Sequence, residues 1–90
     1  MYSYEIKPNL QNILKKLSKK DRVLYERVMN KIGEIINSYD VEHYKNLRYD
    51  MKDLKAVHVG SFVLVFEFIR PENKISFEDF DHHDKIYARG

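Results

Sequence analysis

Four histidines, at positions 43, 58, 82 and 83, are the residues of this chain best suited to acid–base chemistry. An unperturbed imidazole titrates near about pH 6.5, so two of them can supply one base and one acid at neutral pH. We single out His58, near the end of one predicted strand, and His83, which comes just after another. If residues 82–87 form a helical turn, the side chains of His83 and Tyr87 project on the same side. Such a set could assist the attack of an RNA 2′-hydroxyl on its own phosphate, with the tyrosine ring stacking on a base or holding the phosphate.

That reaction also needs positive charge beside the phosphate, and the segment from Asp40 to Asp53 offers it. Basic residues alternate there with aromatic ones, and the candidates for contact with RNA are Lys45, Arg48, Lys52 and, just beyond, Lys55. Interleaved cations and rings suit RNA because cations meet phosphates and rings stack on bases. The same pattern is typical of an ordinary surface loop, and alternation along the following strand places Lys55 on the core side. Both interpretations stay open at this point.

A metal site is the alternative for the acidic segment around His82 and His83. Adjacent histidines flanked by carboxylates can bind divalent ions, and Asp79, Asp81 and Asp84 are the carboxylates close by. The chain has no cysteine and no His-x-x-x-His spacing that would put two ligands on one helix face. We therefore predict neither a metal nor another cofactor.

A β-hairpin centred on Gly60-Ser61 must position the first of the two histidines. A Gly-X pair between two runs of β-branched and aromatic residues indicates a type II′ turn, because glycine adopts a positive φ without steric cost. With that turn, His58 faces Val63 across the hairpin. Alternation then assigns Phe62, Leu64, Phe66 and Phe68 to the core face, and His58, Val63, Val65 and Glu67 to the opposite face.

The remaining elements follow from periodicity and capping signals. Residues 2–7 alternate as a half-buried strand, and Pro8 ends it before Asn9, a good N-cap residue. Two amphipathic helices follow, separated by a tight break at Ser18–Asp21 that caps the second. A last strand, Ile75–Phe80, comes after a proline turn. The order β-α-α-β-β-β predicts an α+β fold in which a helical hairpin packs on one face of a small antiparallel sheet, the other face is open, and a short C-terminal turn or helix ends the chain.

Composition favours one small folded unit. Ninety residues suit a single domain, 1–90, and 43% hydrophobic residues argue against disorder. The absence of cysteine and of an apolar stretch long enough to span a bilayer predicts a cytoplasmic protein without a membrane partner. The net charge is +2, but residues 1–55 carry twelve Lys and Arg against eight Asp and Glu, which is compatible with a polyanionic partner.

Five stretches, spread over nearly the whole chain, form a further pattern. They are Tyr4-Glu5-Ile6, Leu14–Leu17, Leu47-Arg48-Tyr49, the hairpin Leu54–Phe66 and the closing His82–Tyr87. In this order the sequence resembles the RelE/ParE superfamily of type II toxin–antitoxin toxins, which share the element order predicted above. RelE-like members cut messenger RNA in the ribosomal A site and are silenced by a cognate antitoxin that wraps them. The resemblance therefore implies an endoribonuclease (mRNA interferase) with a RelB-like antitoxin and ribosome-bound mRNA as partners.

The resemblance is uneven where the family carries its basic site residues. RelE-type toxins usually place an arginine directly after the aromatic residue that follows the hairpin turn, and this position is Val63 here. Their lysines on the preceding strand fall at Leu54 and Ala56. A closing arginine of many members becomes His83.

A histidine-based branch of the superfamily is a better match, since its hairpin histidine, late histidine and closing aromatic fall at His58, His83 and Tyr87. That branch implies His83 as the principal acid or base, His58 as partner base or phosphate contact, and Tyr87 as the residue that positions the substrate. Two places depart from it: its acidic residue before the hairpin aromatic is Ser61 here, and its early histidine is Lys45.

Two other functions fit the same resemblance. A ParE-like toxin would bind and poison DNA gyrase without cutting RNA. A toxin-fold protein that has lost its activity would serve only as a binding partner.

Overall fold

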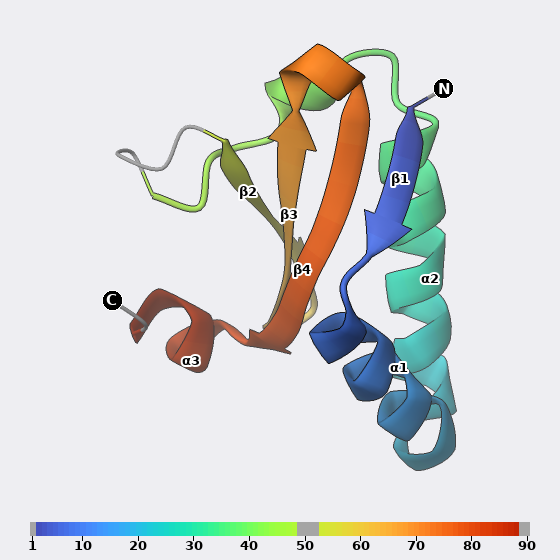
Figure 1. Ribbon diagram of the computed structural model, residues 1–90. Helices are drawn as coiled ribbons and strands as arrows, with labels where there is room; N and C mark the ends of the chain where they lie inside the picture. The colour runs from blue at the N-terminus through green and yellow to red at the C-terminus, as the bar shows by residue number, and fades with distance from the viewer. Residues whose placement is uncertain (1, 49–52, 89–90) are drawn as a thin grey trace.

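Two helices pack against one face of a four-stranded sheet, and a short third helix lies on the other side (Figure 1). The computed structural model describes residues 2–48 and 53–88. In chain order the elements are β1 (Ser3–Ile6), α1 (Pro8–Lys20), α2 (Arg22–Ile36), the 3-10 turn η1 (Val41–His43), β2 (Leu54–Val59), β3 (Phe62–Ile69), the 3-10 turn η2 (Arg70–Glu72), β4 (Lys74–His82) and α3 (His83–Ala88). The predicted α+β class and the β-α-α-β-β-β order are confirmed.

The strands lie in the order β1-β4-β3-β2. β2 pairs with β3, and β3 with β4, as antiparallel neighbours, whereas β1 runs parallel to β4. The sheet is therefore mixed rather than antiparallel throughout. Parallel strands need a long crossover connection, and the helical hairpin lies in the chain between these two strands. Alternation predicted the first strand but could not name its neighbour, because periodicity carries no information on pairing.

The β2–β3 hairpin has the predicted register. His58 pairs with Val63 across the turn at Gly60 and Ser61. Gly60 has a φ of +61°, and Asn73 is the other described residue with a positive φ, so this turn has the single positive φ that type II′ requires. As a consequence Leu64 and Phe66 are buried beneath the helices, and His58 is exposed on the other face.

The helices cover the aromatic face of the sheet. Their apolar stripes are buried in one cluster with the inward residues of the strands, among them Leu10, Val28, Ile35, Phe66 and Phe77. The predicted break at Ser18–Asp21 is shorter in the structure, because α1 continues to Lys20 and Asp21 alone separates the helices. Asp21 caps α2, its carboxylate accepting the Leu24 N–H at 3.1 Å. The predicted cap of α1 is wrong: Lys7 is the N-cap and Pro8 the first helical residue, where a proline loses no hydrogen bond. Asn9 instead donates its side-chain amide to the Asp79 carboxylate at 3.3 Å.

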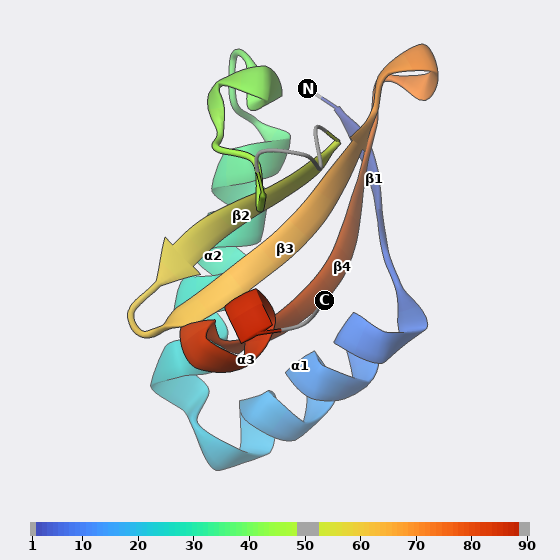
Figure 2. The same ribbon diagram turned by 90° about the vertical axis from the view of Figure 1, so that its left-hand side faces the viewer.

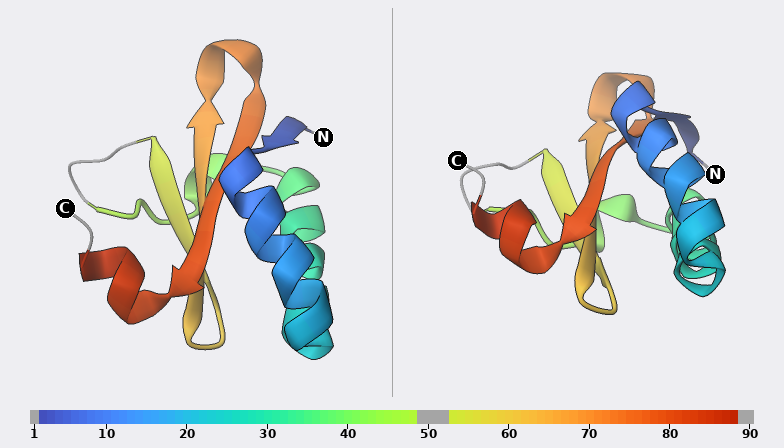
Figure 3. Two further views of the ribbon diagram at one scale, coloured as in Figure 1. Left: turned by 60° about the horizontal axis from the view of Figure 1, so that its bottom comes forward. Right: turned by 90° about the horizontal axis from the view of Figure 1, so that it is seen from below.

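The second face of the sheet is partly covered, whereas alternation predicted it to be open. Val63 and Val65 are buried on that face against Ile86 of α3, with Leu47, Leu54 and Ala56 packed around them. We call this group the outer cluster. β4 runs on to His82 rather than ending at Phe80, and α3 then turns back across the ends of β3 and β4 (Figure 2). From other directions the sheet separates α3 from the two longer helices (Figure 3).

No helix among residues 2–48 and 53–88 has both the length and the apolar character needed to cross a membrane.

Replacement of Gly60 tests the turn that orients His58. Gly60→Ala places a side chain at a φ of +61° and 3.4 Å from the Arg27 guanidinium, and we expect a loss of about 1–2 kcal/mol in the free energy of unfolding. Gly33→Ala is the matched control, because an added Cβ there meets nothing within 4 Å and a helical site should gain about 0.4–1 kcal/mol. Urea unfolding measures both. Equal effects of the same sign would contradict the assigned turn.

An ion-pair cluster on β1 makes the free energy of unfolding depend on pH in the acidic range. Glu5 pairs with Lys74 of the neighbouring strand and with Lys7 at 3.2 Å. These contacts, with the Lys74 hydrogen bond foremost, lower the pKa of Glu5 from 4.5 to about 2. Because the folded-state pKa is depressed, the stabilisation is complete above pH 4.5 and is lost as the pH falls towards about 2. In denaturant titrations, the wild type should exceed Glu5→Gln at pH 6, and the gap should close by pH 2; a constant gap would refute this linkage.

Candidate active site

His58 and Tyr87 face each other on the outer side of the sheet. Their ring centroids are 6.3 Å apart, with the planes inclined by 32°. His58 is exposed on β2, and the Tyr87 side chain on α3 is 42% exposed. Two rings from distant parts of the chain therefore border one solvent-accessible spot. Neither the His58 ring nor the Tyr87 ring lies on the face of the sheet that α1 and α2 cover.

Three contacts hold α3 in the position that makes this meeting possible. Ile86 is 3% exposed and packs into the outer cluster against Val63. The His83 backbone N–H donates to the Ser61 carbonyl at 3.0 Å, which ties the start of α3 to the hairpin turn. The Arg48 guanidinium donates to the Tyr87 carbonyl at 3.0 Å, near the other end of the helix.

His83 begins α3, four residues before Tyr87, so the two side chains share one side of the helix. Its side chain is 46% exposed, and its Nδ1 lies 3.0 Å from the Asp84 carboxylate. A carboxylate at Nδ1 holds the proton of a neutral imidazole on that nitrogen and leaves Nε2 as the proton acceptor. Asp84 is thus an orienting residue that sequence reasoning considered only as a metal ligand. Of the two predicted histidines, His58 contacts the Tyr87 ring, whereas His83 is related to Tyr87 by its position one helical turn earlier.

The His82 ring lies beside the His83 ring, with centroids 4.5 Å apart and planes inclined by 30°. The His82 ring also makes an edge contact with Phe62, with centroids 5.7 Å apart, and its Nδ1 accepts the Asp84 N–H at 3.2 Å. Within the described residues, His82, His83 and Asp84 form a group whose ligand atoms lie within 4.8 Å of one another. Within this group the His82 Nδ1 accepts a backbone N–H, and the Asp84 carboxylate lies 3.0 Å from the His83 Nδ1 and 3.6 Å from the His82 Nδ1.

The predicted RNA-binding cations have different environments. Arg48 is half-buried beside α3, and Lys45 is exposed on the strand-like segment that precedes it. Lys52 lies outside the described residues. Lys55 is only 4% exposed and donates its ammonium to three oxygens of residues 42–46. That burial argues against Lys55 as a contact for RNA, and its place on the core face agrees with the alternation of β2.

The positions at which RelE-type toxins usually carry basic residues have a different use here. Val63 is buried in the outer cluster with Ile86, and Leu54 and Ala56 pack against that cluster. Apolar side chains therefore occupy all three positions. The sequence contains no motif that predicts this packing, because isolated apolar residues are normal in any strand.

No protein-family model matches the chain, but full-length relatives do. Over 90 residues the chain is 46% identical to a protein of Methanocaldococcus jannaschii named "Putative toxin RelE4", covering 99% of this chain and 94% of that protein. It is also 40% identical over 88 residues to an uncharacterized protein of Methanosarcina mazei, covering 97% of this chain and all of the other.

Solved structures share the fold at low sequence identity. A mutant of the E. coli toxin RelE in the free state superimposes with a TM-score of 0.75 at 18% identity, over 97% of this chain and 90% of that one. The E. coli RelBE toxin–antitoxin complex gives 0.73 at 18% identity, over 91% and 96%. The RelBE2 complex of Mycobacterium tuberculosis gives 0.59 at 15% identity, over 91% and 98%.

The helical hairpin, the mixed sheet and the closing helix together define a small α+β protein with the RelE fold. With a relative at 46% identity along almost its entire length, the chain belongs to the family of RelE-like toxins.

The contact between His58 and Tyr87 can be measured directly. In the proton NMR spectrum we expect a nuclear Overhauser effect between the two rings, since their centroids are 6.3 Å apart. Tyr87→Phe should keep it and Tyr87→Leu should abolish it, because only the first variant retains a ring. Loss of the effect in both variants, or its absence from the wild type, would mean that α3 does not dock as described.

Proposed function

We propose that this protein is the toxin of a toxin–antitoxin pair and that it is an endoribonuclease, cutting messenger RNA in the ribosomal A site. Membership of the RelE-like family supports the toxin assignment. The ring contact between His58 and Tyr87, with His83 four residues before Tyr87 on the same helix, is the observation that supports the nuclease assignment. Such a toxin acts where ribosomes are, in the cytoplasm.

The proposed reaction is transfer of the phosphate to the 2′-oxygen. A base removes the proton of the 2′-hydroxyl, the oxygen bonds to phosphorus, and the bond to the 5′-oxygen breaks as an acid protonates it. His83, with Nε2 available, is the principal acid or base in this scheme. His58 serves as the partner base or as a phosphate contact, and Tyr87 positions the substrate by stacking. Neither a metal nor another cofactor takes part.

Positive charge for the phosphate would come from Arg48 and Lys45. Arg48 is closest to the reaction, since its guanidinium lies against α3. Charge near a developing phosphorane lowers the barrier in proportion to how firmly it is held. Lys52 belongs to the same proposal by sequence position alone.

A RelB-like antitoxin is the second proposed partner. Two of the similar solved structures are toxin–antitoxin complexes, from E. coli and Mycobacterium tuberculosis. Co-purification with the product of a small neighbouring gene would support this partner. Stable maintenance of the toxin gene without such a neighbour would count against it.

Alanine substitutions test the histidine roles. His83→Ala and His58→Ala should each relieve growth arrest and lower the rate of mRNA cleavage by about 10²–10⁴-fold, the usual contribution of one acid or base. Antitoxin affinity and unfolding midpoints should stay near wild type. His43→Ala is the matched control, because His43 lies exposed in η1 beside Asp40. Full toxicity of both site variants would refute the assignment.

The outer cluster favours one competing function. Apolar residues at Val63, Leu54 and Ala56 remove the charges that RelE-type toxins usually carry there, as a ParE-like gyrase poison would allow. Induction followed by two assays separates these functions: fragmented mRNA with normal DNA supercoiling supports the nuclease, and intact mRNA with blocked supercoiling supports the gyrase poison.

A further inference from the structure

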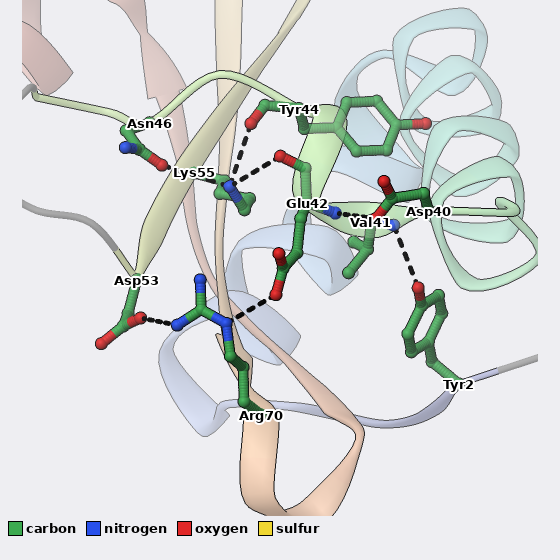
Figure 4. Close-up of polar contacts among 9 residues, drawn as sticks. All are labelled: Tyr2, Asp40, Val41, Glu42, Tyr44, Asn46, Asp53, Lys55 and Arg70. Atoms are coloured by element: carbon green, nitrogen blue, oxygen red, sulfur yellow. Dashed lines mark hydrogen bonds and ion pairs between the residues drawn. The ribbon is translucent and has the colours of Figure 1, made fainter.

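A buried lysine of β2, Lys55, binds residues 42–46 of the segment that follows α2. Lys55 Nζ donates to the carbonyl oxygens of Tyr44 at 3.0 Å and Glu42 at 3.4 Å, and to the Asn46 side-chain oxygen at 3.1 Å (Figure 4). An ammonium has three donors, and all three have acceptors here. Lys55 is 4% exposed.

The acceptors explain how a cation is tolerated at this depth. They are neutral dipoles from the end of η1 and the residues after it, where carbonyls lack partners within a helix and attract positive charge. A buried charge is costly unless it is fully hydrogen-bonded. The ammonium and the segment therefore depend on each other.

Further contacts fix the same segment at its outer edge. Arg70 donates to Glu42 at 2.5 Å and to Asp53 at 3.1 Å, and the Val41 N–H donates to the Tyr2 hydroxyl at 3.0 Å. These contacts lie around the rim of the segment, where the Arg70 side chain is 54% exposed. Lys55 is the contact beneath it.

The residues that follow this attachment, Leu47 and Arg48, contact the outer cluster and α3. The Leu47 N–H donates to the Leu54 carbonyl at 2.8 Å, and the Ala56 N–H donates to the Lys45 carbonyl at 3.1 Å. Leu47 packs in the outer cluster, and Arg48 holds the Tyr87 carbonyl at 3.0 Å. The position of residues 42–46 thus determines where Leu47 and Arg48 meet α3.

We propose that Lys55 is a positioning residue of the candidate active site. Its ammonium sets the path of residues 42–46, which place Leu47 and Arg48 against α3, which in turn holds Tyr87 against His58. The proposal depends on the proposed nuclease function only where it predicts a change in cleavage kinetics. The predicted change in the ring contact does not depend on that function. It assigns to Lys55 no contact with RNA.

Lys55→Met tests this, because methionine keeps the apolar stem and removes the donors. Two readouts are used: the ring-to-ring nuclear Overhauser effect between His58 and Tyr87, and the kinetics of mRNA cleavage on ribosomes. We expect the ring contact to weaken or vanish and kcat to fall by about 10²-fold, as a displacement near 1 Å can cause. Because the displaced residues include Lys45 and lead to Arg48, the proposed phosphate contacts, KM should rise as well; loss of the ring contact distinguishes this variant from one that has lost a phosphate contact alone.

Lys45→Met is the contrasting variant, since Lys45 is exposed on the same segment and loses the same charge. As a proposed phosphate contact it should raise KM and reduce the salt slope by about one, with the ring contact intact. Lys19→Met, on the exposed surface of α1, should change neither readout.

Two results would overturn the proposal. One is a Lys55→Met protein that keeps both the ring contact and kcat; the other is one that shows the signature expected of Lys45→Met. If Lys55→Met does not fold, Asn46→Ala removes one acceptor of the three and should weaken the ring contact in the same direction; an unchanged contact would be equally decisive. A wild type that does not cleave mRNA would refute the proposed function, while the ring contact would still report on Lys55.

Discussion

Burial of the Ile86 side chain against Val63 and Val65 is the contact on which the outer side of the molecule depends. α3 has only six residues, too few to be stable as an isolated helix. Full burial of a side chain of this size contributes about 1.5–3 kcal/mol, which is enough to dock a short helix that is also tied at both ends. Tyr87 and His83 take their positions from that docking.

The same contact connects the composition of the outer cluster with the chemistry available to the protein. A charged residue in place of Val63, which is fully buried in the cluster with Ile86, would lose its hydration, so burial of Ile86 and a charge at this position exclude one another. The His58 and Tyr87 rings lie together outside this buried group, on the same face of the sheet.

Lysines in this chain have roles that their side-chain type does not reveal. The sequence places Lys45 and Lys55 in one candidate set. In the structure Lys45 is exposed to solvent, whereas the Lys55 ammonium is buried and donates to three oxygens. The difference comes from alternation on β2, which turns Lys55 inward, and from the path of residues 42–46, which supply the acceptors. Only the first of these could be predicted from the residues themselves.

Local physics explains which parts were predictable. Gly60 admits a positive φ, so the turn, the register and the outward direction of His58 followed from the sequence, as did the two helices from their apolar stripes. Three features required the tertiary structure: the parallel pairing of β1 with β4, the docking of α3, and the oxygens around Lys55. Each joins residues distant in the chain, and periodicity describes a segment's own faces but not the segment that it meets. The sequence by itself determined the elements, their order and the face on which His58 lies; the tertiary structure decided that Tyr87 lies beside it, because only packing on Val63 and Val65 brings the end of the chain back across the sheet.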